Sequence, residues 1–455
     1  MKSVLISTYE LGRQPFGLAS AAAWLRRAGS EVACLDLSCQ PLDERAVKSA
    51  DVIALYVPMH TATRLAAQLL PVVRKLNPRA HICCFGLYAP MNEEFLRNLG
   101  AQTIIGGEFE EGLAAVFERL RVGANSLSAQ SIARVSLARQ KFLPPERDSL
   151  PPLSRYARLI DQDGRAHITG YTEASRGCKH LCRHCPVVPV YGGRFRIVQP
   201  EVVLEDIRRQ VAIGAEHITF GDPDFFNGIG HAMRIVNALH AEHPKITYDV
   251  TIKVEHLLTH ADLLPVLRDT GCTFVTTAVE SLDDEVLRRL DKGHTRADFM
   301  RVLQLCRDVR LALSLTFIAF TPWTTIESYL HFVCELQELD LADYVAPIQL
   351  GIRLLIPAGS RLLELPEIAE AVGPFDEAAL VYPWKNRDPR VERLCAKIQS
   401  IVYEGTKRKD SRRRIFKSVV QAAYEAAEAE PPATLEQTDR LDRAAVPYLT
   451  EPWYC

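Results

Sequence analysis

The sequence predicts an α/β chain with a doubly wound N-terminal domain, a partial (β/α)6 barrel after it and a helical C-terminal extension. Short apolar runs alternate with amphipathic helical stretches over residues 1–120 and again over 166–360. Such alternation is typical of parallel strands with helices packed on their faces. A segment rich in Ser, Ala and Arg, with two proline pairs, separates the two halves. We therefore place the domains at 1–123, 166–365 and 366–455, with a linker over 124–165.

In the N-terminal domain, apolar runs predict strands over 3–8, 31–37, 52–57, 81–85 and 102–106. The amphipathic stretches 16–28 and 61–76 predict helices between them. Open sheets of this kind bind ligands at the carboxyl ends of their strands. The linker that follows contains Pro144-Pro145 and Pro151-Pro152, which interrupt regular structure.

The second half predicts strands over 167–174, 217–221, 247–254, 274–279, 313–320 and 345–355, with helices such as 199–213 and 297–310 between them. Six strand–helix repeats fit a partial TIM-like barrel. In such barrels the chemistry takes place at the carboxyl ends of the strands, and the candidate motifs described next fall at those ends.

Three cysteines form the most informative motif, Cys178, Cys182 and Cys185, with the spacing Cys-x3-Cys-x2-Cys. Three thiolates, and no fourth, suit an iron–sulfur cluster that keeps one iron open for a small molecule. A structural zinc ion would need a fourth ligand, for which His180 or His184 is available. A disulfide is a further alternative, although disulfides are rare in reducing compartments. Spacing and context favour the cluster.

The triplet, with a strand before it and strand–helix units after it, resembles the radical S-adenosylmethionine (SAM) superfamily over about residues 1 to 400. The resemblance implies a [4Fe-4S] cluster whose open iron binds the amino and carboxylate groups of SAM, and reductive cleavage of a carbon–sulfur bond. Family members usually carry an aromatic or apolar residue before the third cysteine. This chain has His184 there, which we expect to stack on the adenine side of the site.

The resemblance also implies that residues at strand ends contact SAM. Asp222 and Asp224 follow the second barrel strand, where the family holds the amino group of SAM; a simple turn is the alternative. Glu280 and Ser281 end the fourth strand in a pattern similar to the family's Val-Glu-Ser element. We expect them near the ribose or the methionine part of SAM, with a helix cap as the alternative.

Two further strand-end positions have two interpretations each, and a third departs from the family pattern. Lys253, after the third strand, either binds an anionic group or forms a solvated pair with Glu255. Arg353, on the sixth strand, either pairs with the SAM carboxylate or lies on the surface. Phe320 replaces the glycine of the family's Gly-x-Pro turn beside adenine, which changes that contact.

The start of the N-terminal domain resembles the flavodoxin-like cobalamin-binding domains that are fused to many radical SAM enzymes. The usual Asp-x-His-x-x-Gly signature is absent from its first loop, so that loop has no histidine for cobalt. His60, at the end of the third strand, is the one nearby candidate. Two interpretations follow: the domain binds cobalamin without a protein ligand, or it keeps the fold and has lost the cofactor.

The C-terminal extension carries a basic run over 407–414, expected to be a solvated helix face, and ends in Trp453, Tyr454 and Cys455. Terminal residues are normally loose and polar, so this ending suggests docking onto the body or into the site. It resembles a cysteine-tailed radical SAM subgroup found with arsenic-handling genes, of the arsinothricin-biosynthesis type. Cys455 is thus a candidate for binding a soft substrate; hydrophobic docking with an incidental cysteine is the alternative.

The composition limits the class of partner. The 455 residues are 47% apolar with a net charge of −2, so nothing indicates a nucleic acid or an anionic membrane. No apolar run reaches the roughly 18 residues of a transmembrane helix. Twelve cysteines without a secretory signal indicate a cytoplasmic location.

The sequence and its resemblance therefore predict an enzyme that cleaves SAM reductively and transfers a SAM-derived carbon group to a small molecule. A flavodoxin or ferredoxin is the expected electron donor. The resemblance to the arsinothricin-type subgroup implies transfer of 3-amino-3-carboxypropyl to arsenite, and cobalamin-dependent radical methylation is the alternative activity. A metal-stabilised binding protein is the alternative outside enzymes, and it would show no SAM cleavage.

Overall fold

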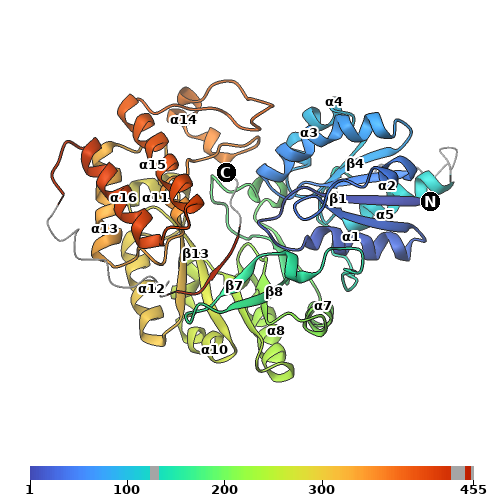
Figure 1. The fold of residues 1–455 in the computed structure, drawn as a ribbon, viewed down its shortest axis with the longest axis horizontal. Coiled ribbons are helices and arrows are strands. Elements are labelled where there is room, and N and C mark those ends of the chain that lie inside the picture. Colours follow the sequence, from blue (N-terminus) through green and yellow to red (C-terminus); the bar gives the residue numbers. More distant parts are fainter. Residues whose placement is uncertain (123–132, 432–445, 452–455) are drawn as a thin grey trace.

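The computed structural model describes residues 1–122, 133–431 and 446–451. Figure 1 shows an N-terminal α/β domain beside a larger barrel-like domain, with the C-terminal helices packed on the far side of the barrel. Within the described ranges, no helix is both long and apolar enough to cross a membrane. Cys455, predicted as a substrate ligand, lies outside the described residues, as do Trp453 and Tyr454.

The N-terminal sheet is parallel, with the strand order β2-β1-β3-β4-β5-β6. Its strands are β1 (Lys2–Ser7), β2 (Glu31–Asp36), β3 (Val52–Tyr56), β4 (His81–Phe85), β5 (Thr103–Gly107) and β6 (Val135–Ser136). The helices are α1 (Phe16–Arg27), α2 (Glu44–Ser49), α3 (His60–Leu76), α4 (Glu93–Asn98) and α5 (Glu110–Val122), with a 3₁₀ turn η1 (Pro90–Asn92).

The five predicted strands of this domain are confirmed to within one residue at each end. Alternate residues of β1 and β3 belong to two separate buried clusters, one on each face of the sheet. Burial on both faces explains why these strands appear as continuous apolar runs in the sequence. The sixth strand, β6, comes from the segment predicted as a linker.

The second sheet has the order β14-β13-β12-β11-β8-β7-β15. Its five parallel strands are β8 (Ala166–Thr172), β11 (His217–Phe220), β12 (Thr247–Thr251), β13 (Cys272–Glu280) and β14 (Ala312–Phe317). The short strands β7 (Arg158–Ile160) and β15 (Tyr448–Leu449) extend it in antiparallel fashion beyond β8. The result is a nearly closed partial barrel.

Helices cover the outside of this barrel. They are α7 (Pro200–Ala212), α8 (Ile229–Glu242), α9 (Val254–Thr259), α10 (Leu264–Asp269), α11 (Asp284–Leu290), α12 (Arg296–Val309) and α13 (Ile326–Glu338). Short 3₁₀ turns are η2 (Leu153–Arg155), η3 (Phe225–Gly228) and η4 (Ala261–Leu263). An antiparallel ribbon of β9 (Ser175–Gly177) and β10 (Phe195–Ile197), with α6 (Val188–Tyr191) between them, carries the cysteine motif.

The prediction of a sixth barrel strand over 345–355 is wrong. Val345 and Arg353 make only isolated bridges, to Leu315 and Phe320. The 3₁₀ helix η5 (Pro347–Leu350) lies between these two bridges. A proline has no amide hydrogen to donate to a ladder, so a regular strand does not continue through this segment.

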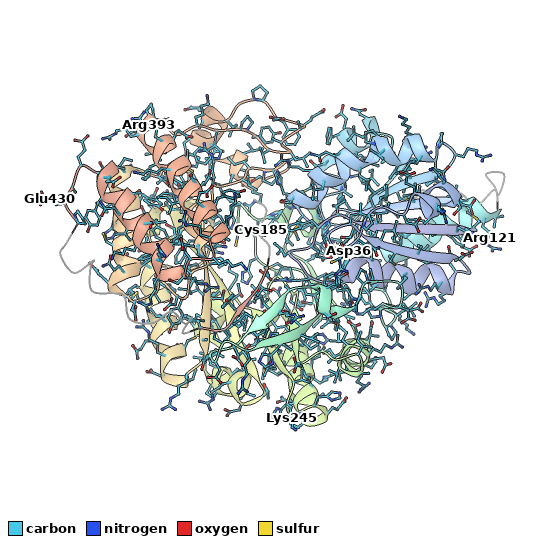
Figure 2. All side chains as sticks on the ribbon, viewed as in Figure 1. Asp36, Arg121, Cys185, Lys245, Arg393 and Glu430 are labelled. Atoms are coloured by element: carbon cyan, nitrogen blue, oxygen red, sulfur yellow. The ribbon has the colours of Figure 1, made fainter. Side chains whose placement is uncertain are left out.

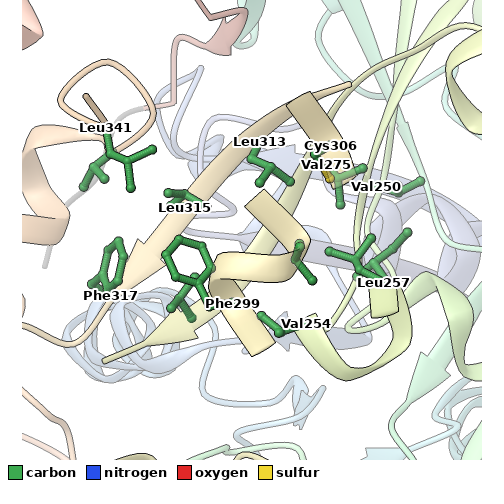
Figure 3. Packing of buried hydrophobic residues seen from close by; sticks show 14 of the residues in the cluster. Val250, Val254, Leu257, Val275, Phe299, Cys306, Leu313, Leu315, Phe317 and Leu341 are labelled. Carbon is green, nitrogen blue, oxygen red and sulfur yellow. The ribbon is translucent and has the colours of Figure 1, made fainter. Parts of the chain in front are cut away.

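The barrel core is one continuous cluster of buried apolar side chains. Figure 3 shows Phe299 and Cys306 of α12 in this cluster with Val275 of β13 and Leu313 of β14. Fully burying a side chain such as Phe or Leu contributes about 1.5–3 kcal/mol. This packing makes the barrel a rigid support for the loops at its carboxyl edge.

The C-terminal extension contains η6 (Arg361–Glu364), α14 (Pro366–Ala371), α15 (Pro389–Lys407) and α16 (Arg412–Ala426). Helices α15 and α16 pack on each other and on α13. The basic run 407–414 is not one solvated helix face, because it spans the turn between these two helices. Arg412 donates to the carbonyl of Asp343 at 2.7 Å, and Arg413 binds its carboxylate at 2.7 Å.

Two buried arginines hold the N-terminal domain against the barrel. Arg147, from the segment predicted as a linker, binds Asp206 of α7 through two hydrogen bonds of 2.8 and 2.9 Å and Gln14 through one of 2.8 Å. Arg176 of β9 binds Glu110 with both terminal nitrogens, at 3.0 and 2.7 Å. Because Glu110 follows β5 and Arg176 precedes the first cysteine of the motif, the carboxyl edge of the N-terminal sheet faces that motif.

Candidate metal and cofactor site

The three cysteines lie on one short loop, residues 178–185, which we call the cluster loop. Figure 2 places Cys185 near the middle of the molecule, between the N-terminal domain and the barrel. The amide of Arg183 in this loop donates to the carbonyl of Leu290 at 2.9 Å. The hydroxyl of Ser360 donates to the carbonyl of Arg183 at 3.1 Å. The loop is thus fixed from α11 and from the start of the C-terminal extension.

The spacing of the thiols argues against a single zinc ion. Among the described residues, one group of three metal-binding donors lies within 4.8 Å of one another, and it is Cys178, His180 and Asp224. Cys182 and Cys185 are outside this group, so the three sulfurs do not converge on one point. Thiolates bound to one zinc at 2.3 Å are only about 3.8 Å apart. The wider spacing suits a polynuclear group such as the predicted [4Fe-4S] cluster.

Burial keeps two of the three thiols protonated unless a cation lies beside them. Burial raises the pKa of Cys178, and it raises the pKa of Cys185 to about 12. A thiolate at such a position needs a cation beside it, and a metal centre deprotonates its thiol ligands outright. The described cysteines are all free, so none of the three is consumed by a disulfide.

Glu280 lies at the end of β13, next to the cluster loop. Its backbone has a φ of 67°, and the pairing of β13 with β14 shifts register between Ala278 and Glu280. The Glu280 carboxylate is 3.3 Å from the ammonium of Lys292 and 3.2 Å from Nε2 of His184. Burial raises the pKa of this carboxyl, but Lys292 and His184 outweigh it and hold the pKa at about 2. The structure therefore brings His184 and Glu280 together around a lysine that the sequence analysis did not select.

Ser281 is adjacent to Glu280 but makes a local contact. Its hydroxyl accepts a hydrogen bond from the amide of Asp283 at 3.1 Å. Asp283, not Ser281, caps α11, since its side chain accepts from the amides of Glu285 and Val286. The cap considered as the alternative role for Glu280 and Ser281 thus belongs to a residue two positions later.

Asp222 and Asp224 follow β11 and have different surroundings. Asp222 accepts hydrogen bonds from the amide of Ala174 at 2.9 Å and from the hydroxyl of Ser175 at 2.5 Å. Burial raises its pKa to about 7 in spite of these bonds. Asp222 therefore ties β11 to the strand that leads into the cluster loop.

Asp224 lies between two histidines. Its Oδ2 atom is 2.7 Å from Nδ1 of His256 and 3.4 Å from Nε2 of His180. Burial raises the pKa of this carboxyl, but the two imidazoles outweigh it and hold the pKa at about 2. His256 was missed in the sequence because the third strand was predicted to run to 254, whereas β12 ends at Thr251 and α9 begins at Val254.

Lys253 directly precedes α9 and is buried. Its ammonium is 3.4 Å from the carboxylate of Glu255. His294 lies near both Lys253 and Lys292, and burial together with these two cations lowers its pKa to about 4. Lys253 is therefore not one half of a solvated surface pair, because only 8% of the residue is exposed.

Arg353 does not join this group. Its guanidinium binds the carboxylate of Glu392 at 2.8 and 3.1 Å and stacks over the ring of Trp384 at 3.6 Å. The predicted pairing with SAM needs a free guanidinium, and this one is committed to the C-terminal extension. Phe320 is also buried away from solvent, stacked on Tyr329 with ring centroids 4.7 Å apart.

A pocket of about 240 Å³ lies at the carboxyl ends of β13 and β14. Its lining includes Glu280, Ser281, Ile318, Thr321, Trp323 and Phe332. Glu280 thus lines this pocket and also contacts Lys292 and His184 beside the cluster loop. A ligand in the pocket therefore has access to a charged carboxylate.

Comparison with known proteins identifies the barrel. Residues 172–333 match the family model described as the radical SAM superfamily. This segment therefore carries the sequence pattern of the radical SAM superfamily. The match begins at the end of β8, includes the cluster loop and ends within α13, so it covers the cysteines, Asp224 and Glu280.

Proteins similar to this chain include the hopanoid C-3 methylase of Methylococcus capsulatus, 24% identical over 326 residues, or 68% of this chain and 62% of that protein. A tRNA-2-methylthio-N(6)-dimethylallyladenosine synthase of Desulfosudis oleivorans is 29% identical over 39% of this chain. The chain spans 62% and 38% of the lengths of these two relatives.

Two solved structures share the fold. The cobalamin-dependent SAM radical enzyme OxsB, solved with aqua-cobalamin and SAM, has a TM-score of 0.66 at 14% identity, covering 89% of this chain and 67% of that chain. The radical SAM methyltransferase TsrM from Kitasatospora setae has a TM-score of 0.61 at 17% identity, covering 82% and 77%. The likeness extends over both α/β domains, so the N-terminal domain and the barrel share the fold of these two structures.

Neither the loop after β1 nor His60 offers a free imidazole at the carboxyl edge of that domain. The edge faces the cluster loop, since Tyr88 after β4 lies within electrostatic range of Cys185. The loop after β1 contains Leu11 and Gly12 in the left-handed region, with φ of 51° and 73°, and no histidine. His60 is already bound, with Nε2 2.7 Å from the carbonyl of Ala379.

Proposed function

We propose that this chain is a radical SAM enzyme that transfers a methyl group from SAM to a small molecule in a cobalamin-dependent reaction. The observation that carries the proposal is the contact between β9, which leads directly into the cluster loop, and the carboxyl edge of the N-terminal sheet, through Arg176 and Glu110. Such an edge is where open α/β sheets bind ligands. The shared fold with OxsB and TsrM, and the similarity to the hopanoid methylase, support the same choice.

In this proposal Cys178, Cys182 and Cys185 hold a [4Fe-4S] cluster. Such a cluster, when bound, would supply the electron for reductive cleavage of SAM, and a flavodoxin or ferredoxin is the electron donor we propose. Lys253 binds the carboxylate of SAM. Its ammonium is buried, and its ion-pair partner among the described residues is Glu255, at 3.4 Å. Glu280, kept ionised by Lys292 and His184, accepts hydrogen bonds from hydroxyl groups of the bound ligand.

Cobalamin, when bound, supplies a cobalt centre that carries the methyl group. The segments after β3 and β4, with His60 and Tyr88, provide the protein surface at the edge of the sheet. His60 is committed to the carbonyl of Ala379, so its imidazole would not be available to a bound cobalamin. Replacing His60 with Ala is therefore expected to leave the electron paramagnetic resonance spectrum of bound cob(II)alamin unchanged and free of splitting by a protein imidazole.

Transfer of 3-amino-3-carboxypropyl to arsenite stays a prediction. Its support at residue level is Cys455, which lies outside the described residues. The two activities differ in the bond of SAM that breaks, so their products separate them.

The test is anaerobic reconstitution with iron, sulfide and hydroxocobalamin, followed by reaction with SAM and dithionite and analysis of the products. Methyl transfer predicts 5′-deoxyadenosine together with S-adenosylhomocysteine, the second only when cobalamin is present. Methylthioadenosine as the main product would overturn the proposal in favour of aminocarboxypropyl transfer. Absence of any SAM cleavage in the cluster-loaded enzyme would favour the binding protein. The Cys178→Ala variant, which should not hold the cluster, is the negative control.

A further inference from the structure

The segment around the cluster loop carries a positive charge that the protein does not balance. Residues 178–200 contain neither Asp nor Glu, although the whole chain has a net charge of −2. The basic residues of this segment are Lys179 and Arg194, which are exposed, and Arg183 and Arg196, which are half-buried. Among the described residues none of them has an ion-pair partner, and the two half-buried guanidinium groups donate to backbone carbonyls. These cations are therefore available to a partner outside the chain.

The two exposed cations belong to one surface, because the turn before β10 packs directly on the cluster loop. A Cβ atom at Gly193 would lie 3.1 Å from Cδ2 of Leu181 and 3.6 Å from the carbonyl oxygen of Lys179. A Cβ atom at Gly177 would lie 2.5 Å from the carbonyl oxygen of Arg194. Both glycines have a positive φ, of 77° and 74°, which glycine adopts without strain. The close approach therefore brings Arg194 beside Lys179 and Leu181.

Leu181 adds an apolar contact to this surface. It is 45% exposed, whereas the next residue, the proposed cluster ligand Cys182, is 6% exposed. The carbonyl of Leu181 accepts a hydrogen bond from Arg361 at 2.7 Å, which fixes this part of the loop. A protein that covers Leu181 thus comes within one residue of a cluster ligand. We call Lys179, Leu181 and Arg194 the basic surface.

Acidic residues beside the cluster loop are paired with other cations. The carboxylates of Glu364 and Asp291 lie 3.0 and 3.8 Å from the guanidinium of Arg361. The carboxylate of Glu255 lies 3.4 Å from the ammonium of Lys253. These acids therefore do not neutralise the basic surface.

We propose that the basic surface docks an acidic one-electron carrier protein of the flavodoxin type. Complementary charge speeds such encounters and orients the partners, and an apolar side chain among charges is typical of the centre of an interface. The carrier gives up one electron, the cluster, when bound, gains it, and NADPH re-reduces the carrier through flavodoxin reductase. This docking role rests on the proposed function, because it needs a cluster that accepts the electron.

A nucleic acid is the other class of partner that a basic surface can bind. Proteins hold single-stranded RNA largely by stacking its bases on exposed aromatic rings. Tyr191 is buried and Phe195 is half-buried, so this segment does not expose such a ring as a platform. The exposed Leu181 among the cations favours a protein partner instead.

The experiment uses the full-length, cluster-loaded enzyme and the double variant Lys179→Glu, Arg194→Glu. Formation of 5′-deoxyadenosine from SAM is driven in one arm by NADPH, flavodoxin reductase and flavodoxin, and in the other by dithionite. The flavodoxin concentration for half-maximal rate should rise about tenfold or more in the variant, while the dithionite-driven rate stays that of the parent. Added salt should weaken the flavodoxin-driven reaction of the parent much more than that of the variant.

The matched control is the double variant Lys75→Glu, Arg79→Glu. Lys75 and Arg79 are exposed cations of the N-terminal domain without an ion-pair partner among the described residues, so the same charges are reversed away from the cluster loop. This control should respond to flavodoxin and to dithionite as the parent does. The milder variant Lys179→Gln, Arg194→Gln guards against loss of folding and should show a smaller shift in the same direction.

Isothermal titration with oxidised flavodoxin measures docking without any SAM cleavage. An enzyme that fails to cleave SAM but binds flavodoxin through Lys179 and Arg194 would refute the proposed function and keep the docking surface. Equal flavodoxin affinity in the parent and in Lys179→Glu, Arg194→Glu would overturn the surface. Equal loss of rate with both reductants would also overturn it, since the charges would then act on the cluster. Weaker binding of bulk tRNA with unchanged flavodoxin binding would assign the surface to a nucleic acid instead.

Discussion

The carboxylate of Glu280 and the ammonium of Lys292 lie 3.3 Å apart, and both side chains are almost fully buried beside the cluster loop. Breaking a buried ion pair by removing one partner leaves an uncompensated charge, which costs far more than the pair contributes when intact. This pair is therefore a sensitive point for both the fold and the site.

The Lys292→Met variant is expected to lose roughly 3–5 kcal/mol of unfolding free energy, because Glu280 is then left with His184 as its partner. The double variant Glu280→Gln, Lys292→Met should recover most of this loss. Chemical unfolding monitored by circular dichroism measures both. Lys397→Met is the control, since Lys397 forms an exposed pair with Glu425. A Lys292→Met protein as stable as the parent would show that the pair is not buried as described.

Each of the variants Cys178→Ala, Cys182→Ala and Cys185→Ala is expected to lose the cluster. Brown colour, iron content and SAM cleavage should disappear together, because three thiolates are the minimum set for a cluster with one open iron. Cys334→Ala serves as control, since Cys334 is half-buried against the hydroxyl of Tyr424 at 3.3 Å. Full iron loading in any of the three variants would contradict the assignment.

Glu108 makes stability depend on pH in a direction opposite to that of an ordinary ion-paired carboxylate. Burial, the largest cause, and nearby Glu110 raise its pKa from 4.5 to about 7, while Arg176 and Tyr191 act against them. The unfolded chain thus releases this proton near pH 4.5, and the folded chain keeps it until about pH 7. Between these values the unfolded state binds fewer protons, so the contribution of Glu108 to stability falls as pH rises.

The Glu108→Gln variant should remove this dependence, which amounts to about 3 kcal/mol across the window. Its unfolding free energy should fall less steeply than that of the parent from about pH 5 to about pH 7, and Gln still accepts from the hydroxyl of Tyr191. Glu118→Gln, on the exposed side of α5, is the control. Parallel pH profiles for Glu108→Gln and the parent would rule out the raised pKa.

Replacing Arg353 with Met should leave SAM affinity unchanged and lower the unfolding free energy by about 1–2 kcal/mol, because its hydrogen bonds go to Glu392. Replacing Lys253 with Met should instead weaken SAM binding by roughly 10- to 100-fold, the loss of one charge-assisted hydrogen bond. Isothermal titration with SAM under anaerobic conditions compares the two. A loss of SAM affinity in Arg353→Met alone would return Arg353 to the cofactor site.

The elements that the sequence predicts well are those whose signal is local. The N-terminal strands are buried on both faces, so each one is a continuous apolar run, and the three cysteines lie within eight residues of one another. Strand β15 escaped prediction because it is two residues long and pairs with β7 almost three hundred positions earlier.

The polar side chains beside the cluster loop could be predicted only in part. Glu280 and Asp224 directly follow strands, and strand ends are the expected places for such residues. His256 became visible only once β12 was seen to end at Thr251, because an error of three residues in a strand end changes which side chains reach the barrel mouth. Arg353 was misplaced for the converse reason, since the strand assumed to carry it does not form.

The hydrogen bond between Arg13 and Glu451 joins residues from the two ends of the described chain, so it forms only after almost the whole chain has been synthesised. Arg13 follows β1, Glu451 lies 438 residues later, and their hydrogen bond of 3.0 Å stacks the arginine against Tyr171 of the barrel. Contacts of such separation form late in folding, because the loop they close is nearly the whole chain. A ribosome has therefore released most of the polypeptide before Arg13 gains its counter-ion. In a chain that stops short of residue 451, Arg13 lacks this carboxylate although its guanidinium still faces the barrel at Tyr171.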